Sequence, residues 1–392
     1  MTETGETWDL VVVGAGPAGA ATALGALAAA PGLRVLLLDR ADFPRDKSCG
    51  DGIAPHVLDV LREVGVDGLT DGWAPLRTLR LTRGDAQVAR TLARPVWVIP
   101  REVFDARLVE RATRAGAVLV RHRVRDVRAT ADGVLVDGRF RASVVVGADG
   151  AHSVVAASTG RPVGRRALAI RGYATTTPQR RGEQRIVFGG RRQPSYAWSF
   201  DRGDGLCNVG YGELLGGRTG TPSRTVLLEQ LEDLLPGAAV DGGQWRGHHL
   251  PLSGRRFHQA DGPLVLVGDA AGLVNPMTGE GIYYAVATGV LAGRAAARTI
   301  AAGSPAEAGS LHRASVRRLL ARHLRHTAAT SRLSTVPAVV AAGLRASAHD
   351  QRVFDDLVEI GLGRGTVTPR LARGLLSALA TRSSAPHPSV TQ

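Results

Sequence analysis

Three apolar runs in the chain are each followed by a turn that contains glycine. The runs are Trp8 to Val13, Ser143 to Ala148 and Leu264 to Val267. After the third come Asp269, small residues and a proline, and then a long alanine-rich stretch that starts near Gly281. This pattern predicts a buried strand that delivers a loop to a helix N-terminus, where the aspartate can accept bonds from sugar hydroxyls and free N–H groups can hold a polar or anionic group.

The first run opens a unit with the order strand, glycine turn, helix, strand. Small residues from Ala20 to Ala30 suit a tightly packed helix, and a second apolar run, Arg34 to Leu38, ends at Asp39. Asp39 lies 20 residues after Gly19, the spacing at which an acidic residue at the end of the second strand meets a ribose. The unit therefore predicts a dinucleotide site. Its turn contains Gly14, Gly16, Pro17, Ala18 and Gly19.

The pattern then changes to short alternating segments. Leu76 to Val98 alternates like a β-hairpin around Gly84-Asp85, and Arg101 lies in the first turn of a helix predicted to end near Ala115. Ala117 to Val136 predicts short strands separated by Asp-Gly turns. We therefore expect a three-stranded meander inserted before the third parallel strand, Ser143 to Ala148.

A second, largely antiparallel region follows. Residues 167 to 212 are strand-like, Val226 to Leu235 predicts a short helix, and the chain returns through His249 to Leu252 to the run at Leu264. The predicted fold class is α/β, with a Rossmann-like nucleotide-binding domain that contains the inserted β-meander. An antiparallel-sheet substrate domain and C-terminal helices complete it.

After Ala302 the chain looks like an appendage. Leu311 to Leu333 predicts an arginine-rich helix, and Val353 to Leu379 suggests two further short helices. The tail from Ser383 to Gln392 is expected to be disordered. We assign residues 1–75, 99–165 and 255–302 to the nucleotide-binding domain, 76–98 and 166–254 to the substrate domain, and 303–392 to a C-terminal helical region.

Composition narrows the class of protein. Hydrophobic residues make up 44% and charged residues 21%, and no run approaches the roughly 18 apolar residues of a membrane span. The N-terminus is acidic and resembles no signal peptide, so we expect a cytoplasmic protein. Cys49 and Cys207 are too few for a disulfide framework or a zinc site, and we predict no metal.

The net charge of +14 comes almost entirely from arginine. These arginines are scattered, without a basic arm or interleaved aromatic residues, so nucleic acid is not an expected partner. An anionic ligand or a membrane surface suits the charge better. The helix from Leu311 favours a solvated face, with peripheral contact to anionic lipid as the alternative. Lys47 is the only lysine, two residues before Cys49.

Three signatures together resemble the FAD-binding set of the para-hydroxybenzoate-hydroxylase-like flavoproteins. They are the turn Gly14 to Gly19 with Asp39, the segment Gly147 to Gly150, and Gly268-Asp269 through Gly281. The resemblance implies that FAD is the cofactor, with its adenosine ribose on Asp39, its pyrophosphate on the first glycines and their helix, and its ribityl chain on Asp269.

The same resemblance extends to single residues. Arg101 matches the family arginine near the FAD phosphate and ribose, and Val124 corresponds to a position beside the adenine. The segment after Gly150 departs from the family, because Ala156 stands where an arginine is usual. The predicted cofactor-binding residues are Gly14, Gly16, Pro17, Ala18, Gly19, Asp39, Arg40, Cys49, Gly50, Arg101, Val124, Asp149, Gly150, Gly268, Asp269, Pro276, Gly279, Gly281 and Ile282.

Within that superfamily, the chain resembles the geranylgeranyl reductase family. Lys47 to Gly50 is similar to its K-x-C-G loop beside the flavin, and Asn275 to Ala285 is similar to its last FAD loop. Pro194 to Gly212 looks like its YxWxFP motif and the NVG-x-G strand that follows, which line a pocket for an isoprenoid chain. Asp201 stands where proline is usual, and Arg202 where lysine is common. The predicted substrate-binding residues are Tyr196, Trp198, Phe200 and Gly210.

Several of these residues could instead have a purely structural role. Cys49 is either a small buried hydrophobe or a group that packs the flavin edge or supplies a proton, which makes it the catalytic candidate. Tyr196 and Trp198 share one strand face, which is core or pocket. Cys207 is expected in the core, and the adjacent pair His248-His249 is interpreted as structural.

The leading hypothesis is a FAD-dependent reductase that saturates an alkene in an isoprenoid or similarly apolar substrate. NAD(P)H is the expected electron donor, bound transiently, because there is no second Gly-x-Gly-x-x-Gly unit. The alternative is a FAD-dependent monooxygenase or tailoring oxidase that hydroxylates a small organic compound. A non-catalytic flavin-binding module is the third hypothesis. The Lys47 to Gly50 loop and the Tyr196 to Gly212 segment favour the reductase.

Overall fold

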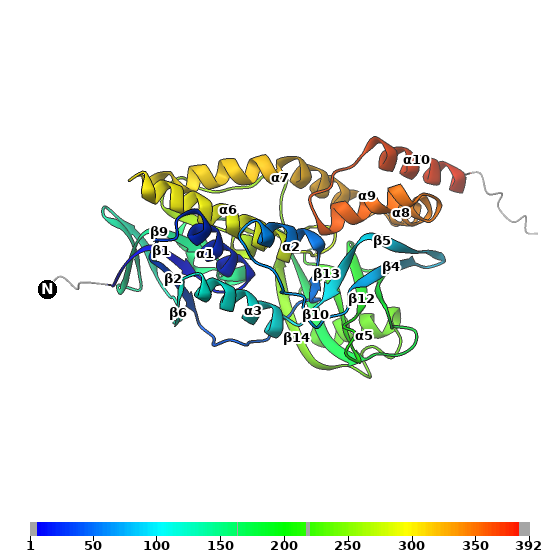
Figure 1. Ribbon diagram of the computed structural model, residues 1–392. Coiled ribbons are helices and arrows are strands. Elements are labelled where there is room, and N and C mark those ends of the chain that lie inside the picture. Colours follow the sequence, from blue (N-terminus) through cyan, green and yellow to red (C-terminus); the bar gives the residue numbers. More distant parts are fainter. Residues whose placement is uncertain (1–5, 163, 217–219, 384–392) are drawn as a thin grey trace, which may run out of the picture.

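The structure is a computed structural model that describes residues 6–162, 164–216 and 220–383. Two β-sheets lie side by side along its length, and helices from the last third of the chain run across the top of both in Figure 1. The chain passes between the two sheets several times, so each is built from segments that are distant in sequence. No helix in the described ranges is long and apolar enough to cross a membrane.

The first sheet is built around parallel strands whose carboxyl ends align. Val13 lies opposite Leu38 and Gly147, and Gly147 lies opposite Leu266. The loops that follow these strands therefore meet at one sheet edge, as the three glycine turns predicted. The strands are β1 (Glu6–Val13), β2 (Val35–Asp39), β6 (Val118–Arg121), β7 (Val127–Thr130), β8 (Gly133–Val136), β9 (Phe140–Gly147) and β15 (Leu264–Leu266), in the order β6-β2-β1-β9-β8-β7 with β15 beside β9.

The meander is made of other strands than predicted. Strand β6 was expected to belong to it, but β6 pairs in parallel with β2 and forms the edge of the first sheet. The meander consists of β7, β8 and β9, and β9 is also the third parallel strand. Local alternation predicted the strands but could not assign their partners, because pairing depends on residues far away in sequence.

Helices α1 (Pro17–Ala29) and α6 (Ile282–Ala301) are packed against each other at very short range. A Cβ added at Gly289 would lie 2.4 Å from the Ala18 carbonyl oxygen, and one at Gly293 would lie 2.1 Å from that of Thr22. The tightly packed helix expected from Ala20 to Ala30 is thus confirmed. Both N-termini point to the edge where the loops meet. Helix α3 (Arg101–Arg114) also contacts α1.

The second sheet is mostly antiparallel, with the order β14-β10-β13-β12-β11-β4-β5-β3. The hairpin predicted over residues 76–98 is confirmed by β4 and β5. The short helix α5 (Arg224–Leu234) packs on the face of this sheet that is formed by β10, β12 and β13. The strands are β3 (Gly52–Ile53), β4 (Leu76–Arg83), β5 (Ala86–Val98), β10 (Arg166–Thr175), β11 (Glu183–Phe188), β12 (Ser195–Asp201), β13 (Leu206–Leu214) and β14 (Gly243–Pro251).

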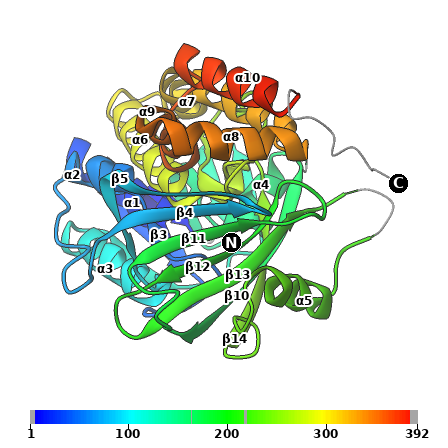
Figure 2. The ribbon, with the colours of Figure 1, turned by 90° about the vertical axis from the view of Figure 1, so that its right-hand side faces the viewer.

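The C-terminal region covers the second sheet and is not an appendage. Helix α7 (Ala308–Leu333) follows α6, and α8 (Pro337–His349) and α9 (Gln351–Leu362) pack on β5, with α10 (Pro369–Ser383) outside them (Figure 2). The prediction of two short helices missed α8, which has apolar contacts on both sides and therefore lacks amphipathic periodicity. The predicted disordered tail lies, apart from Ser383, outside the described residues.

Two smaller helices complete the description. Helix α2 (Pro55–Arg62) follows β3, and α4 (Val154–Ser158) follows the loop after β9. Three 3₁₀ turns lie at Gly150–His152, Gly268–Ala271 and Pro305–Glu307. The architecture agrees with the predicted α/β class, a Rossmann-like domain joined to a curved antiparallel sheet.

Candidate active site

A cavity of about 1260 Å³ lies between the two sheets. One end is bounded by the carboxyl ends of β1 and β2, the middle by the loop at Lys47 to Gly50 and the loop before α6, and the other end by helices α7 to α10. Nearly all the predicted site residues line this one cavity. The exceptions are Gly19, Gly268 and Gly210, which pack behind its wall.

The end of the cavity at β2 is organised by Asp39. Its Oδ2 accepts the backbone N–H of Ala15 at 2.9 Å, and its Oδ1 accepts that of Ala41 at 3.0 Å. The carboxylate is thereby held at the glycine turn, with Arg40 and Val124 on the same wall. Gly19 supports the turn from behind, because a Cβ there would overlap the carbonyl of Gly14.

Two arginines share one buried carboxylate beside the glycine turn. Arg101 Nε and Nη2 donate to Asp105 at 2.6 and 2.7 Å, and Arg45 Nη1 lies 3.2 Å from the same carboxylate. Although burial opposes it, Asp105 raises the pKa of Arg101, so this guanidinium is always charged. A Cβ at Gly16 would lie 3.2 Å from Arg45 Nη2. Sequence reasoning found Arg101 but missed Arg45 and Asp105.

Asp269 lines the middle of the cavity, with Lys47 and His248 as neighbours. Its Oδ2 is 3.4 Å from Lys47 Nζ and 3.9 Å from His248 Nε2. Burial raises the pKa of Asp269, but the Lys47 ammonium and His248 outweigh it and hold that pKa well below its usual range. The carboxylate is therefore ionised, and the only lysine in the chain is its ion-pair partner.

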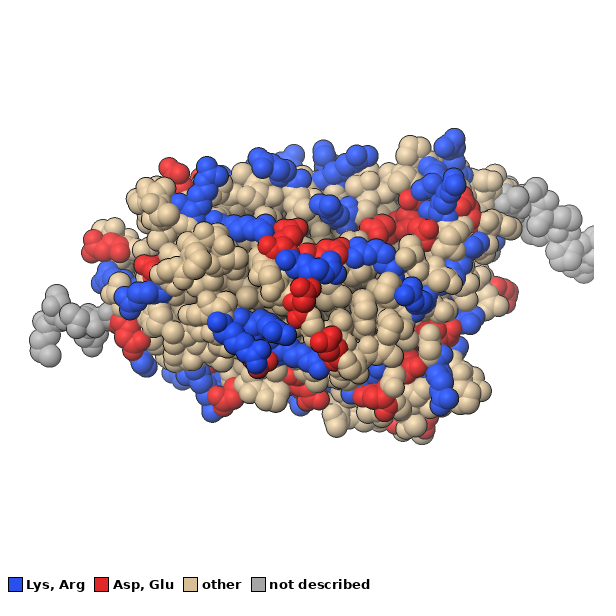
Figure 3. Space-filling model, in the orientation of Figure 1, with Lys and Arg blue, Asp and Glu red and all other residues tan. Residues whose placement is uncertain are grey.

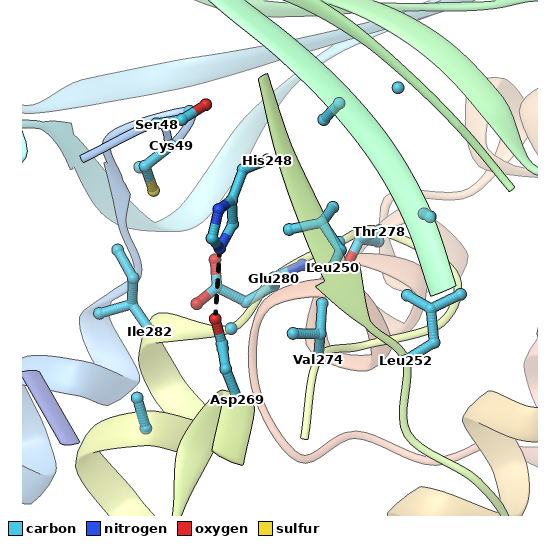
Figure 4. Close-up of a pocket in the computed structure, with 18 of the residues that line it drawn as sticks. Ser48, Cys49, His248, Leu250, Leu252, Asp269, Val274, Thr278, Glu280 and Ile282 are labelled. Atoms are coloured by element: carbon cyan, nitrogen blue, oxygen red, sulfur yellow. Dashed lines mark hydrogen bonds and ion pairs between the residues drawn. The ribbon is translucent and has the colours of Figure 1, made fainter. Parts of the chain in front are cut away.

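His248 lines the cavity, which its interpretation as a structural residue did not predict. Its ring points from β14 toward Asp269 in Figure 4, and it lines the cavity, whereas His249 packs edge-on against His152. The period-two alternation of β14 places residues 246, 248 and 250 on the cavity face, and residue 252 just after the strand lines the cavity too. That signal was present in the sequence. It was missed because the adjacent histidines were judged only as metal ligands.

The predicted anion-holding end of α6 is partly occupied by the chain itself. The Glu280 carboxylate accepts the backbone N–H of Tyr283 at 2.9 Å, immediately beside the N-cap Gly281. Burial raises the pKa of Glu280 to about 7, although the backbone N–H groups of Tyr283 and Ile282 and the charge of Arg101 lower it. Glu280 lies in the same loop that lines the cavity with Pro276, Gly279, Gly281 and Ile282, and Figure 4 shows it with His248 and Asp269 among the lining residues.

The segment after β9 is fixed by Asp149 and by an arginine that sequence reasoning missed. The Asp149 carboxylate accepts the N–H of Val154 at 2.7 Å and so stabilises the start of α4, while Asp149 and Gly150 border the cavity. Ala156 offers no charge at the position where the family has arginine. Arg161, five residues later, donates to the Ala270 carbonyl at 3.0 Å and joins this segment to the loop of Asp269.

The loop of Cys49 is tied to the aromatic strand by one buried amide. Asn208 Nδ2 donates to the Cys49 carbonyl and to Asp51 Oδ2, both at 2.8 Å, and its Oδ1 accepts from Trp198 Nε1 at 2.8 Å. Burial raises the pKa of the Cys49 thiol, although Arg101 lowers it, so the group is a thiol at neutral pH. Asn208 was not predicted, and only its place in the NVG-x-G strand pointed to it.

Asp51 lies behind Cys49 and is fully buried. Tyr173 donates to its Oδ2 at 2.7 Å, whereas Oδ1 has no hydrogen-bond partner. Burial raises the pKa of Asp51 to about 6, although Arg171 and these two hydrogen bonds lower it. Its backbone φ of 59° is left-handed, a conformation that aspartate tolerates better than most residues.

The aromatic face of β12 lines the cavity. Tyr196, Trp198 and Phe200 follow one another with ring centroids 5.9 and 6.4 Å apart, and all three border the cavity. The Tyr196 hydroxyl donates to the Thr278 carbonyl and so joins this strand to the loop before α6. Gly210 lies opposite Trp198, and a Cβ there would be 2.3 Å from the indole. Its contribution is to make room for that ring.

An apolar branch of the cavity was not predicted. It continues from the aromatic strand between the second sheet and the C-terminal helices, which were expected to lie apart from the site. Its two walls come from segments more than 100 residues apart, so no local pattern could reveal it. The sheet contributes Leu79, Leu81, Val96, Ile186 and Phe188, and the helices contribute Val339, Val340, Leu344, Phe354, Val358 and Leu375.

Comparison with known proteins agrees with this geometry. Residues 7–186 match the family model described as FAD binding domain. A menaquinone reductase of Mycolicibacterium smegmatis is 34% identical over 310 residues, which cover 72% of this chain and 75% of that protein. A digeranylgeranylglycerophospholipid reductase of Methanosarcina acetivorans is 30% identical over 338 residues, which cover 76% and 77%.

The chain belongs to the geranylgeranyl reductase family of FAD-dependent oxidoreductases. A solved structure of a geranylgeranyl bacteriochlorophyll reductase-like protein from Thermoplasma acidophilum shares its fold, with a TM-score of 0.78, 20% identity and 96% of each chain covered. The predicted family and FAD as cofactor are thus confirmed.

The cavity of this geranylgeranyl reductase family member fits FAD. Helix α1 starts at Pro17 without a side-chain cap, which leaves the first-turn N–H groups of Ala18 and Gly19 available to an anionic group, near Arg45 and Arg101. A Cβ at Gly281 would lie 3.5 Å from Asp269 Oδ1, so the backbone of this loop runs close beside that carboxylate. A carboxylate at the glycine turn, a pair of arginines and a second carboxylate therefore follow one another along a single cavity.

Proposed function

We propose that this protein reduces a carbon–carbon double bond in an isoprenoid or similarly apolar substrate. The names of two relatives, menaquinone reductase and digeranylgeranylglycerophospholipid reductase, support this substrate class. The observation that carries the proposal is the apolar branch, which joins the cavity at the aromatic strand and has two walls made mainly of aliphatic and aromatic side chains. A prenyl chain suits such a channel because it has no polar groups to satisfy.

Bound FAD, once reduced, supplies the hydride for this reaction. The chain supplies the geometry and the proton. Asp39 and Asp269 are proposed to hold the two sugar portions of the cofactor, and Arg45 with Arg101 its pyrophosphate. The Tyr196, Trp198 and Phe200 rings are proposed to hold the reacting end of the substrate beside Cys49.

Saturation of an alkene requires one hydride and one proton on adjacent carbons. We assign the proton to the Cys49 thiol, because burial keeps it protonated at neutral pH and because its loop borders both the cofactor region and the apolar branch. The thiolate left behind is stabilised by the Arg101 guanidinium, which already lowers the pKa of Cys49. Solvent returns the proton after the product leaves.

NAD(P)H is the proposed electron donor. The Gly-x-Gly-x-x-Gly motif occurs once in the chain, in the turn at Gly14, and that turn serves FAD. The donor would therefore bind transiently and leave before the apolar substrate reacts. Stopped-flow reduction of the bound flavin by NADH and by NADPH measures this directly.

Anaerobic turnover tests the proposed reaction. The purified holoenzyme is reduced and offered a panel of prenylated lipids and quinones, and the products are read by mass spectrometry for a gain of two hydrogens. Saturation of at least one prenyl compound is expected. Hydroxylated product with stoichiometric oxygen consumption, and no saturation under anaerobic conditions, would instead identify the FAD-dependent monooxygenase alternative.

A further inference from the structure

Helix α7 presents an arginine face that the cavity does not use. Arg318, Arg322, Arg325 and Arg332 follow one another at spacings of four, three and seven residues, which place them on one helix face, and all four are exposed. Among the described residues, none of the four has an acidic partner within ion-pair distance. Helices α7, α8 and α10 contain no aspartate or glutamate. Basic side chains stand along the upper edge of Figure 3, over the position of α7 in Figure 1.

Exposed aliphatic side chains lie just after the arginine row, at and beyond the end of α7, and on α10. Leu333 is 53% exposed, Val336 47% and Leu376 67%. They represent three of the six large apolar side chains that are exposed in the described part of the chain. Single exposed leucines are ordinary, but Leu333 and Val336 follow arginines that have no ion-pair partner within the residues that the structure describes, and Leu376 on α10 adds a third exposed aliphatic group.

The same residues surround the outer end of the apolar branch. Leu333 itself lines the cavity, together with its neighbours Thr330 and Ser334. On α10, Leu375 lines the cavity and the next residue, Leu376, faces outward. The exposed aliphatic groups are therefore continuous with the channel wall. A chain that enters here passes from exposed aliphatic side chains to a mainly aliphatic interior.

We propose that this surface, Arg318 to Leu333 with Val336 and Leu376, docks on a lipid bilayer that contains anionic headgroups. Arginines beside exposed aliphatic residues are the combination that holds a protein at a membrane surface, since the cations attract the headgroups and the aliphatic groups enter the acyl boundary. Nucleic acid fits less well, because the surface offers aliphatic groups where base stacking needs aromatic rings. The idea extends the proposed function by placing the substrate entrance at the membrane.

Vesicle flotation of the full-length holoenzyme tests the docking surface. Vesicles of phosphatidylcholine alone are compared with vesicles of phosphatidylcholine and phosphatidylglycerol at a ratio of about 7:3. Binding to the anionic vesicles that weakens with added salt is expected. The double variant Arg322→Gln/Arg325→Gln should lower partitioning by roughly tenfold to thirtyfold. Val336→Ser/Leu376→Ser should lower it by about tenfold or more.

Matched controls lie on the opposite side of the molecule. Arg181→Gln/Arg224→Gln removes the same charge at exposed positions near α5, and Val240→Ser removes an apolar side chain that is 79% exposed. Both should bind like the wild type. Equal loss in control and test variants, no preference for anionic vesicles, or displacement of the vesicles by a short RNA would overturn the proposal. Vesicle binding needs no turnover, so this result and the anaerobic assay fail independently.

Discussion

At the scale of single residues, the Cys49 loop is held by a carboxyl that carries a proton more readily than usual. Asp51 is enclosed by Tyr173 and Asn208, faces the guanidinium groups of Arg171 and Arg101, and has one oxygen without a partner. Its position two residues from Cys49 couples the protonation of a buried group to the loop that borders the cofactor region. Stability is therefore expected to depend on pH through this residue.

The sign of this pH dependence follows from the direction in which the pKa of Asp51 is shifted. The pKa of Asp51 is raised from 3.8 to about 6, so the folded chain binds this proton more tightly than the unfolded chain. The stability contributed by the protonated group is complete below pH 4 and is lost as the pH rises through about 6. Asp51→Asn keeps the shape, tolerates the left-handed backbone and removes the titration. The wild type should lose roughly 3 kcal/mol more unfolding free energy than the variant between pH 4 and pH 7.5.

Urea unfolding at a series of pH values measures this difference. Asp132→Asn in an exposed turn is the control and should follow the wild type. Glu280 titrates in the same direction, because its pKa is also raised, so the difference between wild type and variant is the quantity that isolates Asp51. Parallel curves for wild type and Asp51→Asn would show that Asp51 is ionised throughout.

Cys49 is the residue whose chemistry is tested most directly. If its thiol supplies the proton, Cys49→Ser should lower kcat for alkene saturation by about 10² to 10⁴, because a serine hydroxyl is a far weaker acid. Reduction of the bound flavin should remain near the wild-type rate. Cys207→Ala is the control, because Cys207 is a buried cysteine in the hydrophobic core between the second sheet and α5. An unchanged saturation rate in Cys49→Ser would assign Cys49 to packing.

At the scale of elements, the contact between α1 and α6 holds two ends of the site together. Each helix begins at the cavity, one beside the arginine pair and the other beside Glu280. Gly293→Ala places a Cβ 2.1 Å from the Thr22 carbonyl, so the helices must separate. We expect a loss of about 1 to 3 kcal/mol in unfolding free energy and weaker retention of FAD.

Thermal unfolding and the FAD-to-protein absorbance ratio after dialysis measure these two effects. Gly32→Ala is the control, since a Cβ at that loop position meets no atom within 4 Å. Retention of FAD at the wild-type level despite a lowered melting temperature would show that the contact between α1 and α6 stabilises the fold but does not hold the FAD site together.

Elements that are fixed by local sequence could be predicted, whereas elements that are fixed by packing against distant segments could not. The unit from β1 to Asp39 was predictable, because its glycines, apolar runs and acidic residue have a fixed local order. The partner of β6 and the existence of α8 were not, because each is decided by packing against distant segments. At the site, Asp269 and Cys49 lie in recognisable loops, whereas Arg45, Asn208 and Glu280 gain their importance only from neighbours that the fold brings to them.

At the scale of the whole molecule, the apolar branch exists only because the second sheet and the C-terminal helices face each other. A change on a helix should therefore alter substrate length without touching the Cys49 end of the cavity. Gly343 on α8 lines the branch, and a Cβ there would meet Leu375 at 3.6 Å and Leu357 at 4.0 Å without overlap. Gly343→Leu keeps the helix, since leucine is the better helix former, and extends a side chain into the branch.

Chain-length selectivity is the measurement that checks this arrangement. Gly343→Leu should raise KM for a substrate with four or more isoprene units by about tenfold, while a substrate with one unit keeps its kcat/KM, because filling the branch removes apolar contacts only from the longer chain. Ala348→Leu, at an exposed position on the same helix, should leave both unchanged. An equal loss of kcat/KM for short and long substrates would mean that the branch does not hold the chain. The substrate would then have to bind in the polar part of the cavity.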